Sequence, residues 1–265
     1  MPKFAANLSM LFTELEFLER FAAAAAAGFE GVEYLFPYDF PAGDLAARLK
    51  EQGLTQVLHN LPAGDWGAGE RGIAVLPERT EEFRAGVEQA IAYATALGCR
   101  QVNCLAGIAP PEADPAELEA TFVANLAYAA EKLDAAGIKL LIEPINTRDI
   151  PGFFLNRTRQ ALDIIAKVGS PNLFLQYDIY HMQIMEGDLA PTLSAHLDRI
   201  AHIQLADTPG RHEPGSGEIN YPFLFAHLDG LGYRGWIGCE YKPAAGTEAG
   251  LGWLRSAMAQ TAAAA

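Results

Sequence analysis

Eight short apolar runs of strand character alternate with eight longer helical segments along the whole chain. Such an alternation is typical of repeated strand–helix units around a parallel sheet, and eight of them predict a closed (β/α)8 barrel. The expected strands are Phe4–Leu8, Gly31–Leu35, Thr55–His59, Gln101–Leu105, Lys139–Glu143, Leu173–Asp178, Ile200–Leu205 and Trp236–Glu240. The expected helices are Phe17–Ala27, Asp44–Gln52, Thr80–Leu97, Pro115–Ala136, Arg157–Val168, Leu189–Leu197, Tyr221–Leu231 and Glu248–Ala259.

Six glycines stand just ahead of six of these strands, where the end of a helix needs a residue in the left-handed conformation. They are Gly28, Gly53, Gly98, Gly137, Gly169 and Gly232. The repeated stops favour one architecture throughout, so residues 1–265 are expected to form a single TIM-barrel domain of the α/β class. The alternative, a doubly wound sheet, would favour a glycine-rich dinucleotide turn after the first strand, and Asn7–Phe12 contains no glycine.

The formal net charge of the chain is −14, and its 19 lysines and arginines are spread along the 265 residues. Because nucleic-acid binding depends on clustered basic residues, nucleic acid is not expected as a partner. A small anionic substrate remains compatible with this charge, since a few local cations and a metal can reverse the potential inside a pocket.

The three cysteines, Cys99, Cys104 and Cys239, lie in or beside apolar segments, which favours buried free thiols over disulfides or a zinc cluster. Met1–Phe4 shows no charged leader followed by an apolar core, and no apolar stretch is long enough to span a bilayer. We therefore expect a reducing, cytoplasmic setting and no membrane partner. The sequence indicates no oligomeric state.

Two longer loops follow the expected third and fifth strands and span Asn60–Gly72 and Pro144–Phe154. In barrel enzymes the loops after the strands carry the chemistry, and glycines beside aromatic residues suit a cover that excludes water. The alternative is a pair of ordered surface loops.

Four oxygen-bearing side chains close the last four expected strands: Glu143, Asp178, Gln204 and Glu240. A carboxylate at the end of a buried strand is costly unless it is paired, hydrogen-bonded or bound to metal. Parallel strands would bring the four ends to one rim, where three carboxylates and an amide oxygen form a hard ligand set that favours Mg²⁺ or Mn²⁺. The alternative is four independently satisfied polar residues.

His59 closes the third expected strand, and His181 follows Asp178 by three residues, so both are candidates for hydrogen bonds to substrate oxygens. His202 shares the side of its strand with Gln204 but lies deeper, as a satisfied interior histidine. Two cations, Arg211 and Lys242, follow the last two strands and are candidate partners for a substrate carboxylate. For each cation the alternative is a solvated surface charge.

At these residues the chain resembles the hydroxypyruvate isomerase family, within the wider group of xylose-isomerase-like barrels. The segments that carry the resemblance are Phe4–Phe12, Leu58–Trp66, Leu141–Asn146, Gln176–Met182, Gly217–Tyr221 and Gly238–Pro243. The resemblance implies that Glu143, Asp178, Gln204 and Glu240 hold a divalent metal and that Glu143 and Glu240 also transfer protons. The related epimerases commonly have histidine where this chain has Gln204.

The resemblance implies interconversion of hydroxypyruvate and 2-hydroxy-3-oxopropanoate (tartronate semialdehyde) through an enediolate. Alternatives within the group are isomerisation of 2-oxo-tetronate, or isomerisation or epimerisation of a related ketose or sugar acid. A metal-dependent endonuclease of the same fold group is a further alternative, which the net charge of −14 opposes.

Overall fold

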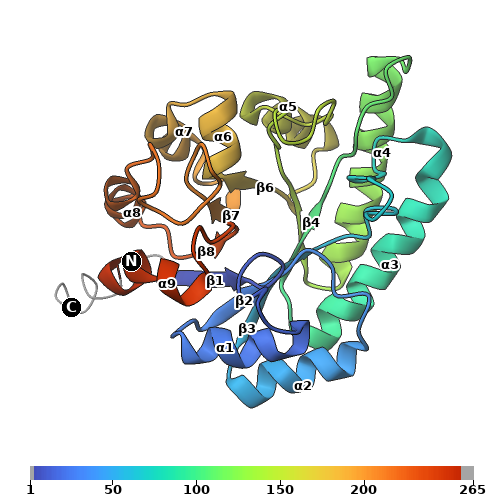
Figure 1. Ribbon diagram of the computed structural model, residues 1–265. Coiled ribbons are helices and arrows are strands. Elements are labelled where there is room, and N and C mark those ends of the chain that lie inside the picture. Colours follow the sequence, from blue (N-terminus) through green and yellow to red (C-terminus); the bar gives the residue numbers. More distant parts are fainter. Residues whose placement is uncertain (1–2, 258–265) are drawn as a thin grey trace.

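The computed structural model describes residues 3–257, and within them eight parallel strands close into one barrel in chain order (Figure 1). Each strand pairs with its neighbours in sequence, and β8 pairs with β1 to close the sheet. The strands are β1 (Lys3–Asn7), β2 (Gly31–Glu33), β3 (Thr55–Asn60), β4 (Gln101–Cys104), β5 (Lys139–Ile142), β6 (Leu173–Asp178), β7 (Ile200–Leu205) and β8 (Trp236–Cys239). The predicted (β/α)8 TIM barrel is therefore confirmed.

Helices surround the barrel on its outside (Figure 1). They are η1 (Phe17–Glu19), α1 (Arg20–Ala26), α2 (Ala42–Gln52), η2 (Pro77–Arg79), α3 (Thr80–Leu97), α4 (Pro115–Ala135), α5 (Thr158–Val168), α6 (Ile179–Met185), α7 (Leu189–His196), α8 (Tyr221–Gly230) and α9 (Thr247–Gly250). Residues 252–257 are also helical, and the expected remainder of that helix, to Ala259, lies outside the described residues. None of the helices within residues 3–257 is long and apolar enough to cross a membrane.

Helix α6 directly follows the sixth strand, in a segment where the sequence analysis expected no helix. Its N-terminus is capped by Asp178, whose side chain accepts a hydrogen bond from the backbone N–H of Tyr180 at 2.8 Å. A carboxylate in this position satisfies one of the free amides that begin every helix. The cap turns the chain sharply, so that His181 on the first turn stays close to Asp178.

The six glycines ahead of the strands all have positive φ, between 65° and 94°. Gly53, Gly98 and Gly169 are left-handed C-caps of α2, α3 and α5. The three cysteines are free and buried, as expected.

Apolar side chains fill the barrel interior toward the end where the strands begin. Ala5, Val57, Leu58 and Leu141 form a buried cluster there, and Phe174, Ala201 and Trp236 pack against it. Lys3 and Lys139 lie over the rings of Trp236 and Phe174, at 5.4 and 4.8 Å from the ring centroids. This plug leaves the opposite end, where the strands finish, as the open end of the barrel.

Candidate active site

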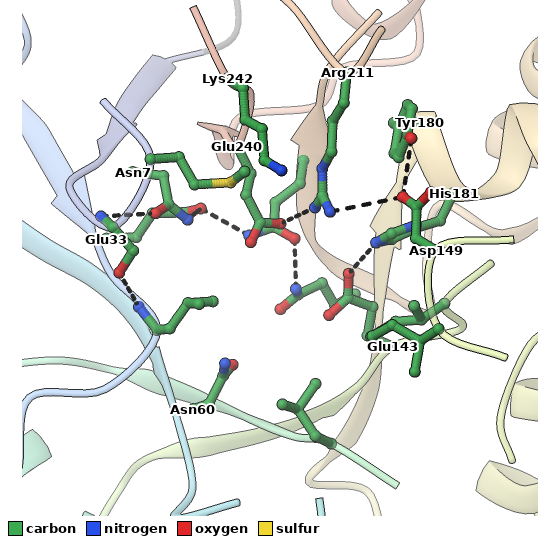
Figure 2. Close-up of a pocket in the computed structure, with 18 of the residues that line it drawn as sticks. Asn7, Glu33, Asn60, Glu143, Asp149, Tyr180, His181, Arg211, Glu240 and Lys242 are labelled. Carbon is green, nitrogen blue, oxygen red and sulfur yellow. Dashed lines mark hydrogen bonds and ion pairs between the residues drawn. The ribbon is translucent and has the colours of Figure 1, made fainter. Parts of the chain in front are cut away.

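A cavity of about 600 Å³ opens at the carboxyl ends of the strands, and its lining is rich in charged side chains (Figure 2). Glu33, Glu143 and Glu240 reach it from the ends of β2, β5 and β8, while His181 comes from α6. Arg211 and Lys242 reach it from the segments that follow β7 and β8. The rim that the sequence predicted to be functional is thus a single pocket.

Glu143 directly follows β5 and is 4% exposed. One of its oxygens, Oε2, accepts a hydrogen bond from Asn103 Nδ2 at 3.1 Å. The other, Oε1, is buried with no hydrogen-bond partner among the described residues. Burial, followed by repulsion from Glu240 and Asp178, raises the pKa of Glu143 well above its usual value.

Glu240 and Asp178 are buried around the guanidinium of Arg211. Arg211 Nη2 lies 3.4 Å from Glu240 Oε2 and 4.0 Å from Asp178 Oδ2. Burial raises the pKa of both carboxyl groups, and Arg211 acts in the opposite direction by stabilising their charged forms. Asp178 Oδ2 has no hydrogen-bond partner within residues 3–257.

The orientation of His181 follows from the amide of Asn146. Asn146 Oδ1 accepts a hydrogen bond from the backbone N–H of Asp149 at 2.7 Å, so its Nδ2 is the atom 2.7 Å from His181 Nδ1. Burial and Arg211 lower the pKa of His181 well below its usual value, so the ring is neutral at pH 7. Its Nδ1 therefore accepts from Asn146, and its proton is on Nε2.

His181 Nε2 lies 3.5 Å from Asp178 Oδ2 and 3.9 Å from Glu143 Oε1. The N–H on this atom can donate to a substrate oxygen placed between the two carboxylates. The structure thus places His181 in the cavity, and its role in substrate binding stays a prediction.

Glu33 lines the cavity from the end of β2, and the sequence analysis gave it no role. It is fully buried, and both of its oxygens are paired: Oε1 accepts from Asn7 Nδ2 at 3.0 Å and Gln204 Nε2 at 2.7 Å, and Oε2 accepts from His202 Nε2 at 2.7 Å. His202 is buried in the interior as expected but only half satisfied, since its Nδ1 has no hydrogen-bond partner among the described residues. We call Asn7, Glu33, His202 and Gln204 the Glu33 network. Glu33 closes β2 in the structure as Asp178 closes β6, but the expected strand ran on to Leu35, which placed Glu33 inside it.

The room for Glu33 is made by Gly238 on β8. A Cβ on Gly238 would lie 2.2 Å from Glu33 Oε1, so any side chain there would displace the carboxylate. Gln204, another member of the Glu33 network, accepts a hydrogen bond at its Oε1 from Gln176 Nε2 at 2.6 Å.

The structure does not bring His59 to the cavity, which corrects its assignment to substrate binding. Its neighbours Leu58 and Asn60 line the pocket, and alternate side chains of a strand point to opposite faces. His59 is instead buried with its ring centroid 6.1 Å from that of Tyr38, and neither ring nitrogen has a hydrogen-bond partner among the described residues. Burial lowers the pKa of His59 to about 4.

Both loops that the sequence singled out lie at the mouth of the cavity. Trp66 and Arg71 reach it from the loop after β3, and Ile145 and Asp149 from the loop after β5. Asp149 Oδ2 accepts from the hydroxyl of Tyr180 at 2.9 Å and lies 3.9 Å from Arg211 Nη1. Lys242 points its ammonium group toward Glu240 (Figure 2) and makes no ion pair with the part of the chain that the structure describes.

A divalent cation fits the donors present. The ligand atoms of Glu143, Asp178 and His181 lie within 4.8 Å of one another, and two of the carboxylate oxygens are buried without a partner. Unpartnered buried carboxylates are costly, and a hard cation is the group that oxygen donors of this kind prefer. His181 Nε2 carries a proton in this arrangement, so carboxylate oxygens suit the cation better than this ring nitrogen does.

The chain is similar to one known protein family and to several named proteins. The profile of the family described as "Xylose isomerase-like TIM barrel" matches residues 21–257. A 2-oxo-tetronate isomerase from Cupriavidus necator is 55% identical over 255 residues, covering 96% of this chain and 98% of that protein. A hydroxypyruvate isomerase from Escherichia coli is 56% identical over 254 residues, with the same coverage. A solved structure described as an AP endonuclease of family 2 from Brucella melitensis has a TM-score of 0.95 and 50% identity, covering 97% of this chain and 99% of that one.

Proposed function

Since the chain belongs to the xylose isomerase-like TIM barrel family, we propose that it interconverts hydroxypyruvate and 2-hydroxy-3-oxopropanoate by proton transfer between adjacent carbons. It is an isomerase, as its curated relatives are. The observation that carries the proposal is the pair of buried carboxylates, Glu143 and Glu240, on one cavity with their pKa values raised. A raised pKa makes the ionised carboxylate a stronger base than an exposed one, and a cation bound beside it would favour the ionised form.

The reaction moves one proton from C3 to C2 of the acid. One glutamate of the pair takes the proton from C3, and the electrons of that C–H bond form a C2–C3 double bond as the C2 carbonyl oxygen becomes negative. The resulting enediolate accepts a proton at C2, the hydroxyl proton passes from the C3 oxygen to the C2 oxygen, and a C3 carbonyl remains. Positioned carboxylates typically contribute about 10²- to 10⁴-fold to such steps.

Two other side chains stabilise the developing charge. The Nε2–H of His181 is available to donate a hydrogen bond to the oxygen that becomes negative, because Asn146 occupies the other ring nitrogen. Arg211 offsets the charge of Asp178 and Glu240 and so limits the repulsion between the site and an anionic substrate.

The groups that would hold Mg²⁺ or Mn²⁺ are Glu143, Asp178 and Glu240. The fourth expected ligand, Gln204, already accepts a hydrogen bond from Gln176 at its Oε1, so one lone pair of that oxygen would be left for the cation. When bound, such a cation supplies Lewis-acid stabilisation of negative charge on substrate oxygens. The unpartnered oxygens of Glu143 and Asp178 support this assignment.

The alternative substrate is 2-oxo-tetronate, a four-carbon acid, after which the relative from Cupriavidus necator is named. The two acids share a carboxylate next to a 2-oxo group and differ in the substituent on C3, so the same proton-transfer pair serves both. The ratio of kcat/KM for hydroxypyruvate to that for 2-oxo-tetronate decides between them.

The proposal is tested by assaying purified protein on both acids before and after EDTA treatment, with Mg²⁺ and Mn²⁺ restored separately. We expect turnover that EDTA removes and one of the metals restores. No turnover of either acid with any added metal would overturn the proposed function, whereas turnover unaffected by EDTA, in protein with no metal detected by elemental analysis, would overturn the metal assignment.

Cleavage of DNA at abasic sites is a second candidate, because the Brucella structure carries an endonuclease name. The net charge of −14 opposes it, since DNA binding depends on neutralising phosphates with basic residues. Incubation with a duplex that contains one abasic site, at low salt and with Mg²⁺ or Mn²⁺, tests this candidate directly. Metal-dependent strand cleavage would favour it.

A further inference from the structure

Arg71 is a cation of the cavity to which the sequence gave no role. It lies in the loop after β3 and lines the pocket. Its guanidinium lies over the ring of Trp66, 4.1 Å from the ring centroid, and its Nη1 donates to the carbonyls of Trp66 and Glu70 at 3.1 and 2.7 Å. One edge of the guanidinium is therefore held by the loop itself.

The loop is seated tightly against the next strand end, which fixes the place of Arg71. A Cβ on Gly72 would lie 2.4 Å from the carbonyl oxygen of Leu105, so only glycine permits this approach. The backbone N–H of Val75 donates to the carbonyl of Ala106 at 3.1 Å. On the other side Trp66 packs edge-on against Phe36, with ring centroids 5.1 Å apart.

The positive charge of Arg71 has no acidic partner within residues 3–257. Its neighbour Glu70 is turned away and pairs with Arg79, whose Nη1 lies 2.7 Å from Glu70 Oε1. Arg211, the other arginine of the cavity, lies within 4.0 Å of carboxylate oxygens on Asp149, Asp178 and Glu240. Arg71 therefore keeps an unpaired charge and free N–H donors in the cavity, as a planar group held by its loop, whereas the other unpaired cation, Lys242, is exposed at the mouth.

We propose that Arg71 binds the carboxylate of the substrate and so selects 2-oxo acids over neutral ketoses. This proposal rests on the proposed function, because it assigns the acid end of the same substrate. A planar guanidinium matches a carboxylate with paired hydrogen bonds. The acid group would lie on the β3 side of the cavity, and the adjacent carbons would extend toward Glu143 and Glu240, which follow β5 and β8 on either side of β3 in the barrel.

The first test is the kinetics of Arg71→Met, with Arg84→Met as the matched control. Methionine keeps apolar contact with Trp66 but removes the charge, whereas Arg84 is an exposed arginine on α3 that pairs with Glu81 outside the cavity. We expect KM for hydroxypyruvate to rise roughly 10- to 100-fold in Arg71→Met, the range for one lost charge-assisted hydrogen bond, with kcat within a few-fold. Arg71→Lys should give an intermediate KM, and Arg84→Met should leave it unchanged.

The second test measures equilibrium binding and needs no turnover. Lactate and propane-1,2-diol differ only in that a carboxylate replaces a hydroxymethyl group, and calorimetry gives the dissociation constant of each with and without added Mg²⁺. We expect wild-type protein to bind lactate more tightly than the diol by at least ~10-fold and Arg71→Met to lose this preference. The binding of the diol should not change.

Unchanged KM and unchanged lactate affinity in Arg71→Met would overturn the proposal, as would equal weakening of lactate and the diol, which would indicate a packing role. If Arg71→Met does not fold, the comparison between wild type and Arg71→Lys decides, since lysine keeps the charge without the planar fork. If wild-type protein turns over neither acid, the proposed function fails while the lactate preference still decides the role of Arg71.

Discussion

Two buried acidic regions of the same barrel differ in whether their carboxylates are satisfied. In the Glu33 network each oxygen of the carboxylate accepts hydrogen bonds from interior side chains. In the region of Glu143, Asp178 and Glu240, two oxygens are buried without a partner, and burial raises the pKa of all three groups. Burial is nearly the same in both regions, at 0% exposure for Glu33 and 4% for Glu143.

The difference separates a structural carboxylate from a chemical one. A charge whose lone pairs are all used stabilises the interior but offers nothing to a ligand, whereas a charge with unused lone pairs is costly until a ligand binds. We therefore expect the two regions to respond oppositely to substitution, the first in stability and the second in activity.

The largest expected effect is on turnover in Glu143→Gln and Glu240→Gln. Each variant loses a proton acceptor, so kcat should fall by about 10²- to 10⁴-fold. Thermal unfolding in EDTA should show a midpoint equal to or above that of the wild type, because a buried carboxylate with an unused oxygen has been neutralised. Near-wild-type kcat in either variant would remove that residue from proton transfer.

Glu33→Leu should affect stability most. The variant leaves three buried donors, on Asn7, His202 and Gln204, without an acceptor, at a cost of roughly 3–5 kcal/mol in the free energy of unfolding. Urea denaturation measures it, with Glu51→Leu as the control, since Glu51 forms an exposed helix pair with Arg48. If Glu33→Leu unfolds at the same urea concentration as this control, the Glu33 network is not structural.

His59 is a buried, unpaired group outside both regions, and its effect on the stability of the protein should depend on pH. Its pKa is about 4 in the folded protein and about 6.5 when unfolded, so unfolding takes up a proton between these values and stability falls as the pH is lowered through this window. His59→Leu should remove this dependence, worth up to ~3 kcal/mol across the window. Urea midpoints of both proteins at pH 7 and pH 5 check it, and parallel pH profiles would contradict it.

Lys242→Met should have the smallest effect. Lys242 is exposed at the mouth of the cavity and is not ion-paired to any described residue, and solvated cations of this kind contribute about 0–1 kcal/mol. KM for hydroxypyruvate should rise by less than ~5-fold. A rise as large as that expected for Arg71→Met would make Lys242 an equal partner in binding the carboxylate.

The repeating parts of the fold and site could be predicted from the sequence, because apolar runs and glycine stops recur at each unit. Asp178, Glu143 and Glu240 each sit at or one residue beyond a strand end, so the alternation of strands and helices was enough to bring them together. Glu33 obeys the same rule, but the expected strand ended two residues too late, at Leu35, because the apolar run continues past the end of β2.

The remaining differences have local physical causes. Strand alternation sends His59 outward, although it lies next to Asn60, which faces the cavity. Arg71 lies in an irregular loop, where no period indicates the direction of a side chain. The orientation of the His181 ring depends on the Asn146 amide, a contact between residues 35 positions apart that no local pattern encodes.

Because Gly238 has no side chain, the residues allowed at position 238 depend on the residue at position 33. A Cβ at position 238 would lie 2.2 Å from Glu33 Oε1, so a library randomised at 238 alone and selected for folded protein should return glycine. A library randomised at 33 and 238 together should also return pairs in which a short residue at 33 accompanies a larger one at 238. Only a short residue that still accepts hydrogen bonds, such as aspartate at 33, would keep a partner for Asn7, His202 and Gln204, because losing that acceptor is expected to cost roughly 3–5 kcal/mol. A chimera that takes β2 from one related sequence and β8 from another should therefore fold only where both sequences have the same residues at positions 33 and 238.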